Sequence, residues 1–450
     1  MAVAKLTQGT VSGSLLSLTM PMMLGIFANL GAALFETYLL GSVGTNTLAA
    51  YSFTFAVTGA LGSLSLGISI GLSSVLARTV GSGDHHMTRR LATDGILLLG
   101  IVMLITSTLG FFLIEPLFRL MGAGPDTLPL IVDYMQIWYV ALVFFALPAI
   151  GANALRATGD ARISGSIMVG GAALQAMLDP ILIFGLFGVP AMGIEGAALA
   201  MLISRLVLCA ITFYVLIYRE DLLDFSRTQF SVVLDSWRRI LVVGVPATAT
   251  QLIGPVSTAI IVSFLAAYGK EAVAGFGIAS RVEALAVIPL FALSASIGPF
   301  VGQNWGAQLF DRANQGMQLA FVWSMAWGLG VGLLFFLFGA HIGGVFEDNP
   351  LVVGYASLYL AIVPLSYGTW GVLMMASATF NSLGKPISST IMSVVRMFVI
   401  YVPLAYVGRL YFDVAGIFAA ACISNLVMGI LGFTWNRATY GGKVNLQHQP

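Results

Sequence analysis

The sequence is poor in charge. Only 9% of its 450 residues are Asp, Glu, Lys or Arg, whereas soluble domains average roughly 25%. Apolar stretches of about 18 residues or more recur along the chain, and each is long enough to cross a hydrocarbon core of ~30 Å. This composition predicts a polytopic membrane protein, and a net charge of +1 without a basic patch argues against a nucleic-acid partner.

Motifs that carry reaction chemistry are also scarce. The two cysteines, Cys209 and Cys422, lie inside apolar segments, which favours buried thiols over redox or metal chemistry. The "GSGD" stretch at 81–84 is not a phosphate loop, because no GK[ST] sequence follows it. We therefore expect no cofactor, no ATP drive and no metal site, and the absence of a nucleophile–base pair argues against an enzyme.

Twelve apolar segments are predicted to be transmembrane helices, because an open strand cannot satisfy its backbone hydrogen bonds in lipid. The first segment is too long for a signal-peptide core and has no clear cleavage site, so it is counted as a helix. The predicted spans are 15–40, 48–76, 92–114, 131–154, 163–186, 194–217, 241–267, 273–300, 316–340, 352–378, 387–407 and 414–435.

An even number of spans places both termini on one side of the membrane. The loops of that side hold 14 of the 20 Lys and Arg residues, the other side holds three, and three fall within spans. Since positively charged loops stay in the cytoplasm, we expect a multi-pass protein of a bacterial-type inner membrane with both termini cytoplasmic.

The two halves of the chain resemble each other. Pro21 in "LTMPMMLG" matches Pro246 in "VGVPATAT", 225 residues later, and "VGTNTLAAYSF" (43–53) matches "YGKEAVAGFGI" (268–278) at the same distance. Two further pairs follow in the same order. The repeat predicts an N-terminal lobe (1–217), a cytoplasmic linker (218–240) and a C-terminal lobe (241–450). Two duplicated six-helix lobes favour a transporter over a channel, because similar bundles can rock about a central site.

Several segments carry a resemblance to a known family: "LAA" entering helix 2, "RATGD" after helix 4, "LDPILIFG" in helix 5, "GIEGAALA" entering helix 6 and "PFVGQNWGA" after helix 8. In this order they resemble the multidrug and toxic compound extrusion (MATE) transporters, over residues 10–435. The resemblance implies an all-α membrane protein with two pseudo-symmetric lobes in a V shape. It also implies export of amphipathic, usually cationic compounds, driven by inward flow of protons or sodium ions.

Glu36 and Asp179 are the two acids expected deepest in the membrane, and both lie in the N-terminal lobe. A charged carboxylate at the bilayer centre costs about 2.5–3.5 kcal/mol or more, unless it binds a proton, pairs, or faces water. The repeat partner of Glu36 is Ile261, so the acid is not needed by the scaffold. We predict that it binds the coupling ion; the alternative is a neutral or paired glutamate that only fixes a helix interface.

Other polar residues are expected to support these acids. Asn29 precedes Glu36 by two helical turns, and Gln175 precedes Asp179 by one, so each pair shares a helix face. The family often has asparagine where Gln175 stands and aspartate where Glu36 stands, which puts a strict transfer of ion geometry in doubt. Tyr134 resembles a tyrosine that joins this network in some members, or is an interfacial anchor.

The substrate cavity and its hinges are assigned more broadly. Arg205 in mid-span should face water or one of the two acids. Arg281 and Glu283 flank the cavity or pair with other helices, whereas Met168 and Met201 suit a promiscuous apolar wall. Pro21 and Pro180 are candidate hinges, since each removes a helical hydrogen bond. The family's second set of acids, in helices 7 and 10, is missing here.

These features predict a secondary active multidrug efflux antiporter with H⁺ or Na⁺ as the coupling ion. Its expected partners are small amphipathic cations and membrane lipid, with no obligatory protein partner. The alternative within transport is a flippase for lipid-linked precursors, a class that often has a more basic cavity than the one expected here.

Overall fold

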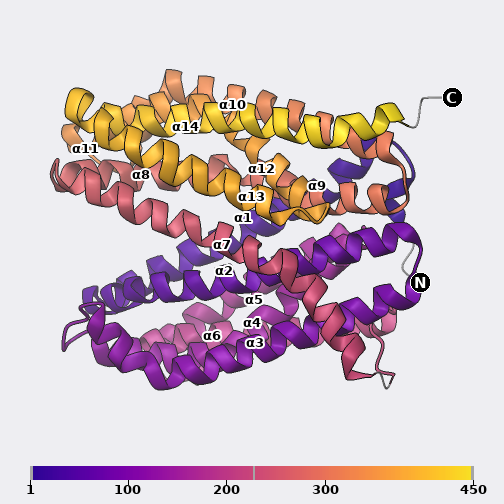
Figure 1. Cartoon of the computed structure of the whole chain (residues 1–450). Helices are drawn as coiled ribbons and strands as arrows, with labels where there is room; N and C mark the ends of the chain where they lie inside the picture. The colour runs from indigo at the N-terminus through magenta and orange to yellow at the C-terminus, as the bar shows by residue number, and fades with distance from the viewer. Residues whose placement is uncertain (1–3, 227–228, 447–450) are drawn as a thin grey trace. The chain divides into compact units, whose positions relative to one another are not determined.

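The chain is helical almost throughout (Figure 1). The computed structural model describes residues 4–226 and 229–446, and no strand occurs among them. In these ranges ten helices are long and apolar enough to cross a membrane, and one bent pair adds an eleventh span. The last of the ten reverses at Phe412 and Asp413, whose backbone is not helical. A Cβ on Gly408 would lie 2.6 Å from the Gly416 carbonyl oxygen, so the two arms of this hairpin touch. The described residues therefore form the twelve crossing segments predicted.

The helices fall into two compact units, which are described separately. The first contains the described residues up to Lys5 and Met20–Thr248, and the second contains Leu6–Thr19 and the described residues from Ala249 onward. The helices of the first half are α1 (Val11–Val43), α2 (Thr45–Ser82), α3 (His85–Leu120), α4 (Leu128–Ala157), α5 (Ala161–Phe184) and α6 (Gly193–Tyr214). Those of the second half are α7 (Phe230–Ala266), α8 (Lys270–Ala286), α9 (Ile288–Gly306), α10 (Phe310–Phe346), α11 (Pro350–Ile362), α12 (Tyr367–Ser382), α13 (Pro386–Val394) and α14 (Val402–Leu446).

The unit boundaries differ from the lobe boundaries drawn from the sequence. Residues 6–19 were assigned to the first lobe but pack with the second unit, and α1 passes from one unit to the other beside Pro21. The predicted linker 218–240 is partly helical, because α7 already begins at Phe230. Its polar residues resembled a loop because this part of the helix extends beyond the apolar segment. Arg227, which was counted among the cytoplasmic charges, lies outside the described residues.

The repeat is visible in the packing of the helices. In the first unit α4 packs against α2, α3 and α6; in the second unit α12 packs against α9, α10 and α14. The second unit is interrupted where the first is continuous. Its α8 and α9 meet at a bend of 45°, a 3₁₀ turn at Val363–Ser366 separates α11 from α12, and a π-helical turn at Val395–Tyr401 follows α13.

The polar motifs at the helix starts have structural roles. Asp84 caps α3, since its side chain accepts a hydrogen bond from the Met87 backbone N–H at 2.9 Å. Asp160, in the "RATGD" motif, caps α5 in the same way through Ile163 and also pairs with Lys5 at 3.4 Å. Such caps satisfy backbone donors that a helix cannot satisfy itself.

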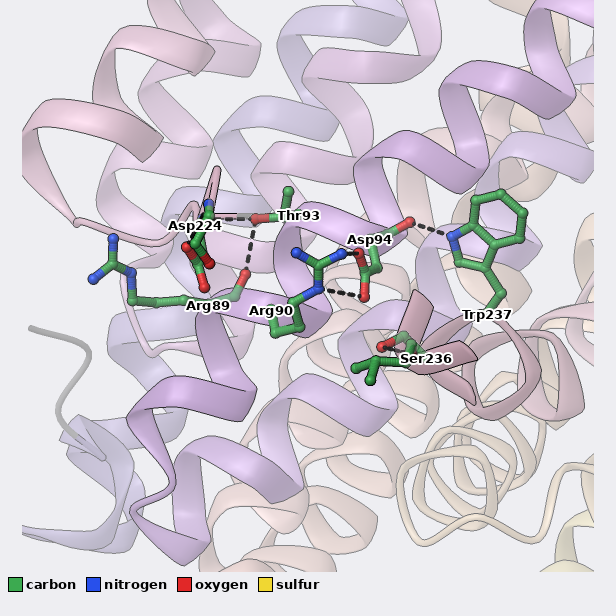
Figure 2. A network of polar contacts seen from close by, with 9 residues as sticks. Arg89, Arg90, Thr93, Asp94, Asp224, Ser236 and Trp237 are labelled. Carbon is green, nitrogen blue, oxygen red and sulfur yellow. Dashed lines mark hydrogen bonds and ion pairs between the residues drawn. The ribbon is translucent and has the colours of Figure 1, made fainter. Parts of the chain in front are cut away.

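The connection after α6 is held against α3 by a polar network (Figure 2). The Arg89 guanidinium donates to the Leu223 carbonyl at 2.9 Å. The Asp224 backbone N–H donates to the Thr93 hydroxyl at 2.8 Å, as Figure 2 shows. On the other side of α3 the Trp237 indole donates to the Asp94 carbonyl at 2.9 Å. The start of α7 is thereby fixed to the first unit.

Candidate functional site

A buried polar cluster lies in the first unit, between α1 and α5. Glu36 on α1 is 4% exposed, and the Gln175 amide on α5 donates to its Oε2 at 3.1 Å. Its Oε1 has no hydrogen-bond partner among the described residues. Asp179, one turn beyond Gln175, is fully buried, and both of its carboxyl oxygens also lack a partner in the described ranges. The two acids are close enough to interact electrostatically.

Arg205 on α6 joins this cluster through Gln175. Its Nη2 donates to Gln175 Oε1 at 3.4 Å, and its guanidinium lies over the Phe145 ring, 5.2 Å from the centroid. It makes no ion pair with either acid in the described structure, and its Nε has no partner there. The sequence left open whether Arg205 binds Glu36 or Asp179; it binds neither directly, and the amide stands between the arginine and Glu36.

Two tyrosines complete the cluster. Tyr134 on α4 is 3% exposed and packs edge-on against Tyr51 of α2, with ring centroids 5.6 Å apart. Tyr51 lies beside Glu36 and was not singled out from the sequence. The signal was available, because its repeat partner is Phe276, which lacks the hydroxyl. In the same way, Glu36 differs from its repeat partner Ile261, which has no polar group.

The remaining predicted residues of the first unit make no hydrogen bond to the two acids in the described structure. The Asn29 amide donates to the Gly25 carbonyl of its own helix at 2.9 Å rather than to Glu36. Met201 is 6% exposed and belongs to the hydrophobic core, so it packs the unit instead of lining an open cavity. Met168 packs against Gly25 of α1. Pro21 lies where α5 approaches α1, since a Cβ on Gly165 would lie 2.6 Å from the Pro21 carbonyl oxygen. Pro180 lies inside α5, directly after Asp179.

A second polar cluster lies in the second unit. The Tyr359 hydroxyl of α11 donates to Glu283 of α8, and Tyr367, which is 1% exposed, lies beside the same carboxylate. Arg281, two residues before Glu283, has an exposed side chain. The two residues therefore do not act as a pair, in keeping with their spacing on a helix.

The positive partner of this cluster is Arg396, on the π-helical turn. Its Nη1 donates to Asn425 Oδ1 at 3.0 Å, and the Asn425 amide donates to the Ser366 hydroxyl at 3.0 Å. Arg396 is also near enough to Glu283 to interact electrostatically. Sequence analysis did not connect these residues, because they come from four segments that are far apart in the chain.

The first cluster combines two buried carboxylates, and the second has the single, partly buried Glu283; each also has an arginine held by an amide, and tyrosines. Burial makes an ionised carboxylate costly, so each acid has reason to bind a proton or a cation. Among the described residues there is no group of three His, Cys, Asp or Glu side chains that could hold a metal ion.

Comparison with known proteins agrees with the duplicated fold. The model of the MatE family matches residues 21–181 and again 246–407, and these ranges begin at the repeat partners Pro21 and Pro246. The chain is 35% identical to the FAD transporter of Shewanella oneidensis over 416 residues, which are 92% of each protein. It is 25% identical to the probable multidrug resistance protein YoeA of Bacillus subtilis, over 88% of each chain.

The fold is also that of a solved transporter. The MATE transporter VcmN of Vibrio cholerae, in its bent form, superposes with a TM-score of 0.91 at 26% identity, covering 98% of this chain and 99% of that one.

Proposed function

Since the chain belongs to the MatE family of membrane transporters, we propose that it is a secondary active antiporter that exports amphipathic organic compounds in exchange for protons. Glu36 and Asp179 are the proposed proton carriers; Gln175 donates to Glu36 and accepts a hydrogen bond from Arg205. The supporting observation is that three of the four carboxyl oxygens are buried without a partner among the described residues. Two neighbouring carboxylates in apolar surroundings do not both stay ionised.

A proton is favoured over sodium as the coupling ion by the same cluster. A sodium ion needs several oxygen ligands and no cation nearby, whereas Arg205 is within electrostatic range of Glu36. Proton binding needs only one carboxyl oxygen.

The proposed substrates are amphipathic, mostly cationic compounds, taken from the cytoplasm or the inner leaflet. The Bacillus relative is named a probable multidrug resistance protein, which supports the export of drugs of more than one kind. Glu283 is the proposed contact for the positive group of the substrate, together with the tyrosines beside it. Met168, Arg281 and the hinge Pro21 are the other cavity and gating residues proposed, in an inner membrane with both termini cytoplasmic.

A second candidate substrate is a flavin dinucleotide. The Shewanella relative, at 35% identity over 92% of both chains, is named a FAD transporter. An anionic pyrophosphate pairs well with arginine, and a planar ring stacks on aromatic side chains. Arg205, which is partly buried in the described structure beside the Phe145 ring, is the residue proposed to meet such a substrate.

The test is uptake into proteoliposomes, with a pH gradient and a sodium gradient imposed separately, using ethidium and FAD as substrates. We expect the pH gradient to drive transport, and Glu36→Gln and Asp179→Asn to abolish it. The exposed acids Glu115 and Asp126 provide matched controls as Glu115→Gln and Asp126→Asn. Full activity of both buried-acid variants, or drive by sodium alone, would contradict the proposal. Transport of only one of the two substrates decides the substrate class.

A further inference from the structure

An open groove runs between α5 and α6 on the first unit, apart from the polar cluster. Its volume is about 460 Å³. Its walls are apolar apart from two arginines and one serine, and the lining residues are Arg162, Ile163, Ser166, Ile167, Gly170, Gly171, Leu174, Val207, Leu208, Ile211, Val215 and Arg219.

The length of the groove matches one leaflet of a membrane. On α5 the lining residues extend from Arg162 to Leu174, and on α6 and the turn after it from Val207 to Arg219. Each wall therefore contains thirteen residues, and the twelve steps between the first and the last cover roughly 18 Å at ~1.5 Å per helical residue. Half of a hydrocarbon core of ~30 Å is about 15 Å, so an extended acyl chain of one leaflet fits along the groove.

Two adjacent glycines form its floor. A Cβ on Gly171 would collide with the Leu208 side chain, so this glycine lets the two helices approach each other. A Cβ on Gly170 would meet nothing within 4 Å, so the space beside Gly170 is empty. The groove is a hollow that a larger side chain at Gly170 would fill without strain.

Both arginines lie at the same end of the groove, where α5 begins and α6 ends. No acid lines the groove in the described structure. Arg219 lies 3.9 Å from the carboxylate of Glu220, and Glu220 is itself 3.7 Å from Lys5. Both arginine side chains are exposed. An apolar channel one leaflet long that ends in two exposed cations complements an anionic headgroup with an acyl chain.

We propose that this groove binds an anionic phospholipid of the cytoplasmic leaflet, with its phosphate between Arg162 and Arg219 and one acyl chain along Gly170. The arginine end is the one that the charge distribution places in the cytoplasm, where anionic lipids attract basic residues. The far end of the groove is Leu174, next to Gln175 of the polar cluster. A bound chain would thus support the α5 segment that holds Gln175.

The test measures lipid retained by the purified full chain, by native mass spectrometry, after exposure to phosphatidylglycerol or phosphatidylcholine. We expect selective retention of phosphatidylglycerol. Arg162→Gln and Arg219→Gln should each reduce it roughly fivefold, since one basic residue near an anionic lipid contributes about that factor. Lysine at either position should restore most of the retention.

Gly170→Leu should block retention by filling the groove while both arginines stay in place. The controls are Gly59→Leu, at another exposed glycine with nothing within 4 Å of its Cβ, and Arg239→Gln, at an exposed arginine outside the groove. Equal retention of the two lipids, or unchanged retention in Gly170→Leu, would overturn the proposal. Displacement of the lipid by ethidium or FAD at one molecule per protein would also overturn it, because the groove would then be a substrate path.

Discussion

The two units have the same scaffold but arrange their buried charges differently. In the first unit Glu36 and Asp179 lie on continuous helices, and Arg205 of α6 is held by an amide of α5. In the second unit the single acid Glu283 lies one turn before the bend between α8 and α9. There Arg396, on the π-helical turn after α13, is held by Asn425 of α14.

The repeat shows which of these features belong to the scaffold. Tyr134 and Tyr359 are 225 residues apart, so they are repeat partners, and each lies beside the acid of its unit. The acids are not partners, since Glu36 corresponds to Ile261. The arginine and the amide have exchanged helices: "ALAMLISRLV" (198–207) matches "FAAACISNLV" (418–427), which makes Asn425 the repeat partner of Arg205. Duplication thus kept the tyrosine and separated the charges, which suits two different tasks, ion coupling and substrate contact.

The largest expected effect is on transport, and it distinguishes Glu36 of the first unit from Glu283 of the second. Glu36→Gln should reduce proton-driven transport by about a hundredfold or more, because a group that acts in the coupled step has no substitute. Glu283→Gln should leave coupling intact and change the affinity for cationic substrate by only about tenfold, the effect of one lost charge contact. Initial rates in proteoliposomes at several substrate concentrations separate the two. Equal loss of maximal rate in both variants would refute the division of tasks.

A second effect tests the amide that joins the charges of the first unit. Gln175→Leu removes the hydrogen bonds to both Glu36 and Arg205 and leaves buried polar groups unpaired, at a cost of roughly 1–3 kcal/mol each. We expect a lower unfolding temperature and about tenfold slower transport, whereas Gln175→Asn should retain most activity. Thermal unfolding followed by tryptophan fluorescence measures the first effect. If Gln175→Leu were as stable as Gln175→Asn, the hydrogen bonds from Gln175 to Glu36 and Arg205 would not stabilise the unit.

A smaller effect compares the paired tyrosines. Tyr359→Phe removes a hydrogen bond to a carboxylate, which is worth about 1.5–3 kcal/mol. Tyr134→Phe keeps the ring packing on Tyr51 and removes no hydrogen bond found in the described structure. The first variant should lower the unfolding temperature and the second should leave it nearly unchanged. If Tyr134→Phe lowered the unfolding temperature more than Tyr359→Phe, the tyrosine hydroxyl would stabilise the first unit more than the second.

The smallest effect lies outside the membrane, in the connection between the halves. The Ser226 backbone N–H donates to the Asp224 carboxylate at 2.9 Å and holds the pKa of Asp224 below its ordinary value of 3.8. The ionised Asp224 carboxylate stabilises the folded connection. This stabilisation is present above pH 3.8 and is lost as the pH falls through the lowered pKa of Asp224. Protease cleavage of the connection should therefore rise only below about pH 4. Asp224→Asn should remove this pH dependence, and an unchanged pH profile in that variant would show that another group is responsible.

The twelve segments, the repeat and the two acids of the first unit could be predicted from the sequence, because hydropathy and charge act locally. The arrangement around the acids could not. Tyr51, Arg396 and Asn425 reach the clusters only through helix packing, and the charge bridge through Gln175 depends on side-chain directions. Met201 was misjudged because core and cavity positions use the same residues. The start of α7 was missed because a polar helix outside the membrane resembles a loop.

The central claim is that Glu36 carries the proton that substrate binding displaces. The direct measurement is proton release in weakly buffered detergent solution, followed with a pH indicator, when ethidium or FAD is added to saturation. The wild type should release protons on binding. Glu36→Gln should bind the same substrate and release fewer protons than the wild type, because only Asp179 then remains as a proposed carrier, and Glu115→Gln should match the wild type. Undiminished proton release by the Glu36→Gln variant would contradict the account.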